Sequence, residues 1–328
     1  MRSMRKSVSG LLQVLVLGAM GLAAALNAHA QYPNRPIRLI IPSPPAGGPD
    51  IVGRLLALKL ADAFGQQVVA ENRVGGNGTI AGESVVKATP DGYTMLVGMD
   101  SMLAINPHLY SKMPFDPQRD LVPVASLVSN GFFLAVHPSV PAHTLAEFIE
   151  HAKRTTPPLA FASGGNGSQH HLTMERLKAR AGFDMVHIPY KGGSPATLAT
   201  VAGDTLAMMS GTSNAGQLRS GKLRAIAYTG TKRSSVMPEV PTIAETYPDF
   251  VMTQWYGLFA PIGTPEPIIA RWRTETTKVL QSADVIERFK AAGGLEPWIS
   301  TADEFTAAIR ADFQRYGKLV RDLGAKVD

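Results

Sequence analysis

The stretch LIIPSPPAGGPD, residues 39–50, decides the fold prediction, because an apolar strand runs there into a proline- and glycine-rich turn. The turn opens a helix that we predict over residues 51–64, and it leaves backbone N–H groups free to bind an anion. A second turn of the same chemistry, SGGNGS at residues 163–168, follows the apolar run 159–162 and again precedes a helical pattern. Two such turns, far apart in the sequence, predict a cleft that closes on a ligand from two sides.

The first thirty residues have the composition of a secretory signal peptide. Basic residues precede an apolar run at 11–26, and the AHA sequence at 28–30 matches the small-residue cleavage pattern. The apolar run is short and ends at this pattern, which favours a cleaved signal over an uncleaved membrane anchor. No cysteine follows the run to carry a lipid. We therefore expect cleavage near Ala30 and a mature chain that is free in the periplasm, with no membrane insertion.

The composition of the mature chain excludes several classes of protein. Removing the signal leaves 298 of the 328 residues, a length that favours two domains with packed cores. The formal net charge is +6 for the whole chain, and the basic signal residues supply half of it, so no nucleic-acid partner is indicated. The absence of cysteine excludes both a disulfide framework and thiolate chemistry.

Strands and helices alternate along the first third of the mature chain. Strands are predicted at 37–41, 67–71 and 94–97, and helices at 51–64 and 79–88. This alternation is typical of an α/β fold in which a mostly parallel sheet is flanked by helices.

A second alternating series begins at the apolar run 132–136, and a further apolar run at 255–260 is followed only by helices. Because these late helices have no new sheet to cover, we expect them to pack on the first lobe. The predicted architecture has a discontinuous first lobe, residues 31–131 and 255–328, and a second lobe, residues 132–254. The two crossings between the lobes would form a two-strand hinge.

Several short motifs have the spacing of known catalytic or binding motifs, but the residues around them do not fit those functions. GNGTIA at 76–81 has the spacing of a dinucleotide fingerprint, yet it follows the second strand rather than the first, and we interpret it as a tight turn. The run GQLRSGK at 216–222 lacks the hydroxyl residue of a phosphate loop. A nucleophile elbow at 211–215 has no histidine after it, since the last one is His187. The histidine pair at 170–171 lacks metal-ligand spacing. We expect no catalytic residue, no cofactor and no metal.

Several long segments of the sequence resemble a known family. They are PSPPAGGPDIVGRLLA from Pro42, VVAENRVGGNGTIAGESVVKATPDGYTMLVG from Val68, FASGGNGSQHHL from Phe161, VHIPYKGGSPA from Val186 and WYGLFAP from Trp255. In these segments the chain resembles the Bug-type extracytoplasmic solute receptors, the substrate-binding components of tripartite tricarboxylate transporters. The resemblance implies a type II-like periplasmic binding protein, whose two lobes close on a small carboxylate or amino-acid-like ligand.

The resemblance also implies how the ligand is held and where it goes. Backbone amides, hydroxyl groups and ordered water would bind it, and helix N-termini would supply positive potential. The partners would be inner-membrane transporter subunits, the receptor would be a monomer, and it would catalyse no reaction. Carried onto this sequence, the ligand-binding residues are Ser43, Pro44, Ala46, Gly47, Gly48, Asp50, Asp100, Ser101, Gly164, Gly165, Asn166, Gly167, Ser168, His171, Tyr190, Lys191, Gly192 and Gly193.

Three places in the sequence depart from the family pattern. Pro49 removes an amide donor, although proline suits the first turn of a helix. Asp100 stands where a neutral residue is common, and a carboxylate facing the cleft would repel a second ligand carboxylate or attract a ligand amine. Ser210 and Gly211 lie near a position where an acid is frequent. These differences leave the identity of the ligand open.

Two other functions are also compatible with the sequence. A sensory receptor would use the same binding chemistry and present its closed form to a membrane signalling partner. An exported enzyme would use Asp50 and Asp100 as a carboxylate pair, and it predicts a turnover that Asp100→Asn abolishes.

Overall fold

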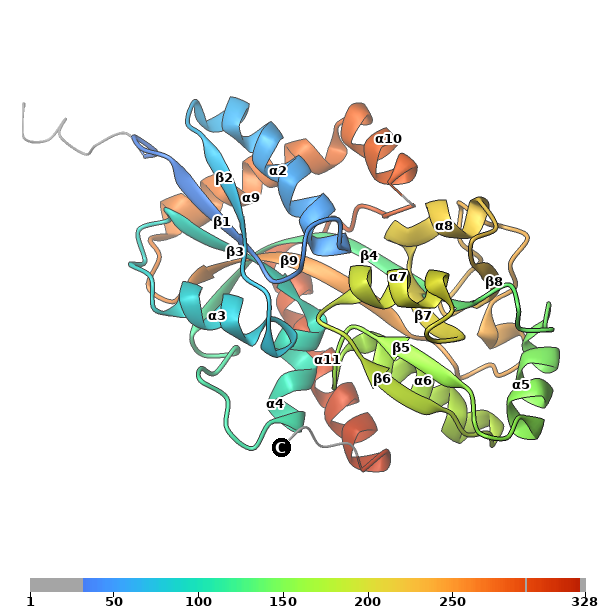
Figure 1. Cartoon of the computed structure of the whole chain (residues 1–328). Coiled ribbons are helices and arrows are strands. Elements are labelled where there is room, and N and C mark those ends of the chain that lie inside the picture. Colours follow the sequence, from blue (N-terminus) through green and yellow to red (C-terminus); the bar gives the residue numbers. More distant parts are fainter. Residues whose placement is uncertain (1–31, 293, 325–328) are drawn as a thin grey trace, which may run out of the picture.

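The computed structural model describes residues 32–292 and 294–324 and shows two lobes, each built on a sheet with helices around it (Figure 1). The strands are β1 (Ile37–Ile41), β2 (Val68–Asn72), β3 (Thr94–Met99), β4 (Leu121–Val136), β5 (Ala160–Ser163), β6 (Val186–Pro189), β7 (Ala207–Gly211), β8 (Arg224–Tyr228) and β9 (Thr253–Pro261). The longer helices are α2 (Gly48–Phe64), α3 (Thr79–Val86), α5 (Leu145–Arg154), α6 (Gln169–Ala181), α7 (Gly193–Ala202), α9 (Glu266–Gln281), α10 (Ala283–Ala291) and α11 (Ala302–Asp322). Short helical segments are η1 (Gly76–Gly78), η2 (Ser101–Ile105), α4 (Asn106–Leu109), η3 (Thr212–Asn214), α8 (Ala215–Arg219) and η4 (Ile243–Glu245).

The strands of the two sheets follow the same spatial pattern. The first lobe has the order β2-β1-β3-β9-β4, and the second has β6-β5-β7-β4-β8. In each lobe the first three strands are parallel, and the fourth runs antiparallel to both of its neighbours. This arrangement confirms the predicted α/β class with a mostly parallel sheet in each lobe, as parallel strands joined by helical crossovers require.

The crossing between the lobes is made by β4 and β9. Strand β4 is 16 residues long, and it pairs with β9 as far as Gly131 and with β7 and β8 from Phe132 onward. Strand β9 pairs with β4 down to Thr253, which lies opposite Gly131. We propose that the lobe boundaries lie at this level, close to the predicted positions 132 and 255.

Each lobe has its own apolar core, which holds the loops at the strand ends in place. In β1, Leu39 and Ile41 are fully buried, and they pack with Leu60 of α2 and Trp272 of α9. In the second lobe, Phe132 of β4 packs with side chains from α5 and α6. Burying such side chains contributes about 1.5 to 3 kcal/mol each.

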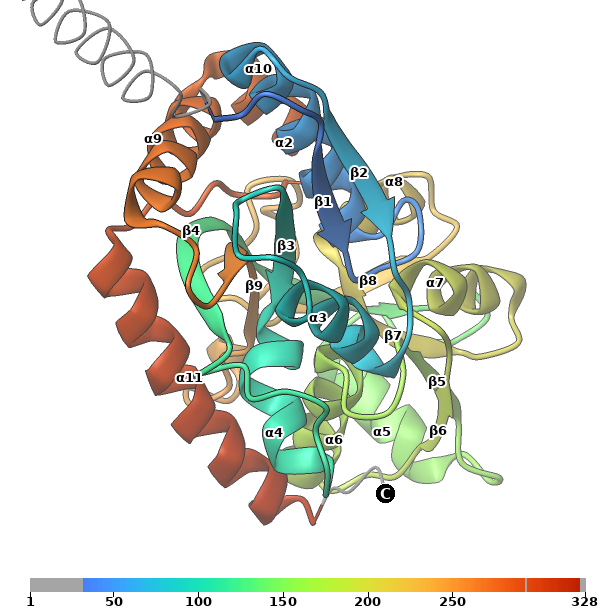
Figure 2. The same ribbon diagram turned by 90° about the vertical axis from the view of Figure 1, so that its left-hand side faces the viewer.

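The late helices pack mainly against elements that we assign to the first lobe. Helices α9 and α10 do so, since α9 lies against α2 and β4. The start of α11 is also there, because Phe305 packs with Trp255 and Phe259. Further along α11, Tyr316 and Val320 belong to the core that contains second-lobe residues. Figure 2 shows α11 running past α4, and its main contacts are with η2, α4 and β4. From the second lobe, Gln169 of α6 bonds the Tyr316 hydroxyl on this helix.

Helix α2 begins at Gly48, earlier than the predicted start at residue 51. Gly47 takes the N-cap position and Pro49 lies in the first turn, where its missing N–H costs no intrahelical hydrogen bond. Asp50 is therefore inside the helix instead of at the end of the preceding turn.

The predicted signal peptide and its cleavage position near Ala30 lie outside the described residues. Among the residues that the structure describes, none of the helices has the length and apolar character needed to cross a membrane.

Candidate functional site

A cavity of about 320 Å³ lies between the lobes, at the ends of the strands. The loops after β1, β2 and β3 line it from the first lobe, and the loops after β5, β6 and β7 line it from the second. Open α/β sheets bind ligands at this end of their strands. The predicted residues that line the cavity are Ser43, Pro44, Gly47, Gly48, Asp100, Ser101, Gly164, Gly165, Asn166, Ser168, Tyr190, Lys191, Gly192 and Gly193.

Helix N-termini converge on this cavity. Helices α2, α6 and α7 start at Gly48, Gln169 and Gly193, all of which line it. The free N–H groups at these ends carry partial positive charge and attract anions. In the described part of the chain, Lys191 is the one lysine or arginine among the lining residues. Burial lowers the pKa of the lining residue His170 to about 4, so its imidazole is neutral at physiological pH.

The two lobes contact each other around the cavity, so the structure is a closed form. Ser194 Oγ donates to the carbonyl oxygen of Pro45 over 3.4 Å. A methyl group on Gly192 would lie 2.7 Å from Cδ of Pro44, and φ of this glycine is +111°. Only glycine permits so close an approach with that backbone conformation.

Asp100 lies at the floor of the cavity, and its carboxyl group is bonded to the protein. It accepts hydrogen bonds from the backbone N–H of Ser101 (2.7 Å), from Nε2 of Gln169 (2.6 Å) and from the backbone N–H of Trp255 (3.2 Å). Burial, reinforced by the negative charge of Asp312, raises the pKa of Asp100 to about 8. Burial therefore favours the neutral form of this carboxyl group, and its oxygen atoms are engaged by N–H groups of the protein itself.

The Asp100 carboxyl group is part of a polar network that joins both lobes. Gln169 comes from the second lobe, and its Nε2 also lies 2.5 Å from the Tyr316 hydroxyl on α11. That hydroxyl donates to the carbonyl oxygen of Thr253 on β9 and accepts from Arg315. Closure of the lobes thus brings α6, β3, β9 and α11 into one network.

Three buried polar atoms that belong to cavity-lining residues have no hydrogen-bond partner among the described residues. They are Ser43 Oγ, Gln169 Oε1 and His170 Nδ1. A buried polar group without a partner costs about 1 to 3 kcal/mol, so these atoms are ready to bond a ligand or water.

Four predicted residues do not line the cavity, namely Ala46, Asp50, Gly167 and His171. Asp50 lies under the first turn, where its carboxylate accepts from the Ala46 N–H (2.9 Å) and pairs with Arg54 (2.8 Å). This role in bracing the turn removes the carboxylate pair with Asp100 that an enzyme would need. Gly167 and His171 face away from the cavity and toward each other, with Nδ1 of His171 accepting from the Gly167 N–H (3.2 Å). His170, one residue earlier on α6, lines the cavity instead.

Sequence reasoning missed several lining residues. Gln169 and His170 lie between the predicted residues Ser168 and His171, whereas Tyr256 lies on β9, away from every predicted site segment. Asn77 lies in the segment that we interpreted as a tight turn and not as a dinucleotide fingerprint; its Nδ2 donates to the carbonyl oxygen of Gly167 across the lobes, over 3.3 Å. The described residues contain no group of His, Asp and Glu side chains suited to a metal ion.

Comparison with known proteins identifies this arrangement. The model of the tripartite tricarboxylate transporter family receptors matches residues 52–325. Protein BugT of Bordetella pertussis is 37% identical over 316 residues, which cover 95% of this chain and 96% of BugT.

Two solved structures with ligands are similar to this chain. Rpa4515 of R. palustris with adipate has a TM-score of 0.87 and 29% identity, over 90% of this chain and 100% of that one. MatC from Rhodopseudomonas palustris with bound malate has a TM-score of 0.83 and 31% identity, over 88% of this chain and 100% of that one.

Proposed function

Because this chain belongs to the tripartite tricarboxylate transporter receptor family, a family of solute-binding receptors and not of enzymes, we propose that it delivers a small carboxylate to such a transporter. The ligand is captured in the cavity between the lobes, and the membrane subunits of the transporter receive it from the closed form. The mature receptor acts in the periplasm as a monomer, after cleavage near Ala30.

The observation that supports this proposal most is the chemistry of the cavity. Helix N-termini converge on it, and unpartnered polar atoms belong to the residues that line it. The volume of about 320 Å³ suits a ligand of a few carbon atoms. The adipate and malate bound by the two similar proteins are of this class.

The proposal is tested by binding measurements on the purified mature chain. Malate, adipate and a panel of related mono-, di- and tricarboxylates are added, and the melting temperature and calorimetric binding are recorded. A ligand present at 100 times its Kd stabilises the folded state by about 2.7 kcal/mol, which gives a shift of several degrees. Absence of any shift and of any heat across the panel would contradict carboxylate capture.

Export and assembly need separate measurements. The mass of the protein recovered from the periplasm is expected to correspond to a chain that begins near Gln31. Size-exclusion chromatography with light scattering is expected to give the mass of one chain. Co-purification with the membrane subunits in the presence of ligand tests the delivery step.

A further inference from the structure

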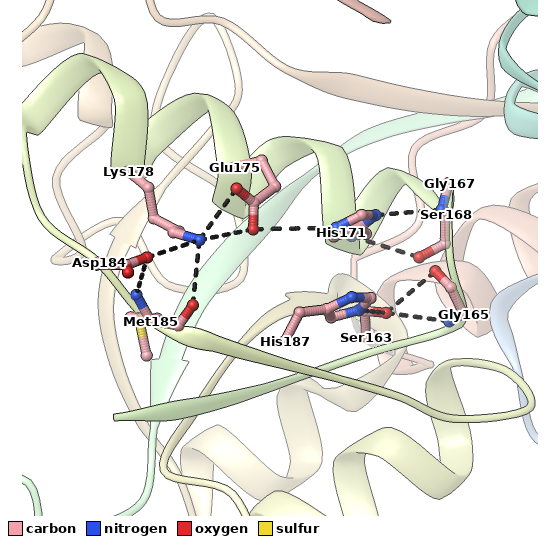
Figure 3. Close-up of polar contacts among 10 residues, drawn as sticks. All are labelled: Ser163, Gly165, Gly167, Ser168, His171, Glu175, Lys178, Asp184, Met185 and His187. Carbon is pink, nitrogen blue, oxygen red and sulfur yellow. Dashed lines mark hydrogen bonds and ion pairs between the residues drawn. The ribbon is translucent and has the colours of Figure 1, made fainter. Parts of the chain in front are cut away.

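Two stacked imidazole rings lie behind the second-lobe loop that lines the cavity. They belong to His171 on α6 and His187 on β6, and neither residue lines the cavity itself. Their ring centroids are 3.9 Å apart and their planes differ by 8°. Phe161 of β5 pairs with His187 across the two strands and lies beside the imidazoles, with its centroid 5.0 Å from that of His187 and 6.4 Å from that of His171. Figure 3 shows both imidazoles beside the loop.

Both rings bind the loop through one of their nitrogen atoms. Nδ1 of His171 accepts from the Gly167 N–H over 3.2 Å. Nε2 of His187 lies 2.6 Å from Ser163 Oγ, which in turn bonds the backbone N–H and carbonyl of Gly165, each over 3.1 Å. The two histidines thus fix the loop at its start and near its end (Figure 3).

The loop needs such support because its own sequence provides little. Gly165 and Gly167 have φ angles of +123° and +72°, and glycines lose more conformational freedom on folding than any other residue. Between and beside them, Gly164, Asn166 and Ser168 line the cavity. A shift of this backbone would therefore move the groups that face a ligand.

Burial, and after it the ammonium group of Lys178, favours the neutral form of His171. Lys178 on the same helix pairs with Glu175 (2.9 Å) and with Asp184 (3.2 Å), and Nε2 of His171 is 3.9 Å from a Glu175 carboxylate oxygen. Burial, together with Lys178, lowers the pKa of His171 to about 4, while burial and the neighbouring His171 lower that of His187 to about 4. Nδ1 of His171 is therefore available as an acceptor over the physiological range.

We propose that His171 and His187 are positioning residues that hold the loop at residues 163–168 in its ligand-binding conformation. His171 does so by accepting from the Gly167 N–H, and His187 by its hydrogen bond with Ser163. The inference rests on the proposed function, because it concerns the same cavity.

Matched variants separate the hydrogen bond from the ring stacking. His171→Asn places an amide oxygen near the position of Nδ1 and gives up the ring, whereas His171→Phe keeps the ring and gives up the acceptor. At the second position, His187→Gln retains a polar atom near Nε2, and His187→Phe does not. The affinities for malate and adipate are measured by calorimetry. We expect the Asn and Gln variants to bind within about twofold of the wild type, and each Phe variant to bind about fivefold more weakly, the effect of one hydrogen bond.

Hydrogen exchange of the ligand-free protein tests the loop independently of any ligand. The Gly167 N–H and the His171 ring both belong to the second lobe, while the Gly167 carbonyl also accepts from Asn77 of the first lobe, a contact that is the same in all the variants. In His171→Phe the Gly167 amide is expected to exchange about fivefold faster than in the wild type, and in His171→Asn at nearly the wild-type rate. Amides of β7 serve as the reference for global stability.

The outcomes distinguish the two proposals. If the wild type binds neither malate nor adipate but the Gly167 amide responds as expected, the positioning role is supported and the proposed function is not supported for these ligands. If Asn and Phe at position 171 give equal exchange rates, the positioning role is overturned, whatever the affinities are. A pH profile adds a further check, because malate affinity in the wild type should decline between pH 5 and pH 4 as Nδ1 of His171 takes up a proton, and should decline less in His171→Asn.

Discussion

Asp100→Asn is expected to remove a pH-dependent loss of stability. The Asp100 side chain is 1% exposed and has no cationic partner among its hydrogen bonds. Burial, reinforced by Asp312, raises its pKa from the ordinary value of 3.8 to about 8. Between these two values the folded protein keeps a proton that the unfolded chain has released. The free energy of unfolding therefore falls as the pH rises through this window, by about 1.4 kcal/mol per pH unit.

The expected change in the free energy of unfolding depends on the pH range over which it is measured. Between pH 6.5 and pH 8.0 the loss that Asp100 causes is about 1.5 kcal/mol, because the folded-state carboxyl starts to ionise near the upper limit. Asparagine has nearly the same shape and no such proton. Urea unfolding of the wild type and of Asp100→Asn at both pH values gives the two free energies of unfolding. Other titrating groups are common to both proteins and cancel in the comparison.

The matched control is Asp50→Asn. Asp50 is 3% exposed, yet it pairs with Arg54 and accepts from the Ala46 N–H, so its replacement is expected to destabilise the protein at both pH values. If the stabilities of the wild type and Asp100→Asn change in parallel between pH 6.5 and pH 8.0, the reasoning is refuted. The Asp100 carboxyl would then be ionised in the folded protein, and its charge would act on the ligand.

Three further changes test the closed form and its buried polar groups. Gly192→Ala sets a methyl group 2.7 Å from Pro44, so we expect at least tenfold weaker ligand binding and a more open scattering envelope. The control for backbone strain alone is Gly182→Ala, because that glycine has a φ of +70° and open space around it. Tyr316→Phe removes a fully buried hydroxyl from the network between the lobes. We expect the free energy of unfolding, measured by urea titration, to fall by about 1 to 2 kcal/mol. An unchanged unfolding midpoint would contradict a role for that network in stability. Burial lowers the pKa of His170 to about 4, so the unfolded chain takes up its proton first on acidification, and this group alone lowers the free energy of unfolding by up to about 3 kcal/mol between pH 6.5 and pH 4. The wild type should therefore lose that much more stability over this range than His170→Asn, and equal pH dependence in the two proteins would count against the reasoning.

Local patterns were sufficient to predict most of the strands and helices. The apolar run before Pro42 and the glycines after it specify β1, a turn and α2 through short-range chemistry alone. The same holds for the second-lobe loop, where Ser168 caps α6 by accepting from the His171 N–H.

The crossing strand β4 could not be predicted in full, because its first part lacks a local strand signal. Pro123 interrupts the apolar pattern and lies at a register shift, a place where a strand tolerates proline. The partner strand β9 is more than a hundred residues away, and only that pairing makes residues 121–131 a strand.

The candidate site was predicted at the level of loops rather than of side chains. His171 was expected in the cavity and His170 takes that place, because one residue along a helix turns the side chain by about 100°. The protonation of Asp100 depends on its burial against Asp312 on the last helix, which no local pattern reveals. The bond between Gln169 of the second lobe and Tyr316 of α11 likewise arises from tertiary packing.

Because β4 serves both sheets, its length is under a double constraint. Phe132 and Leu134 point into one core of the second lobe, and Phe133 and Ala135 into the other. An insertion of one residue at Gly131 would exchange these faces and place Leu134 where Ala135 now fits. The position of each residue along this strand is therefore constrained by both lobes at once. Insertions and deletions should be absent from it in functional descendants of this gene. Neither lobe can be produced alone without taking the strand from the other.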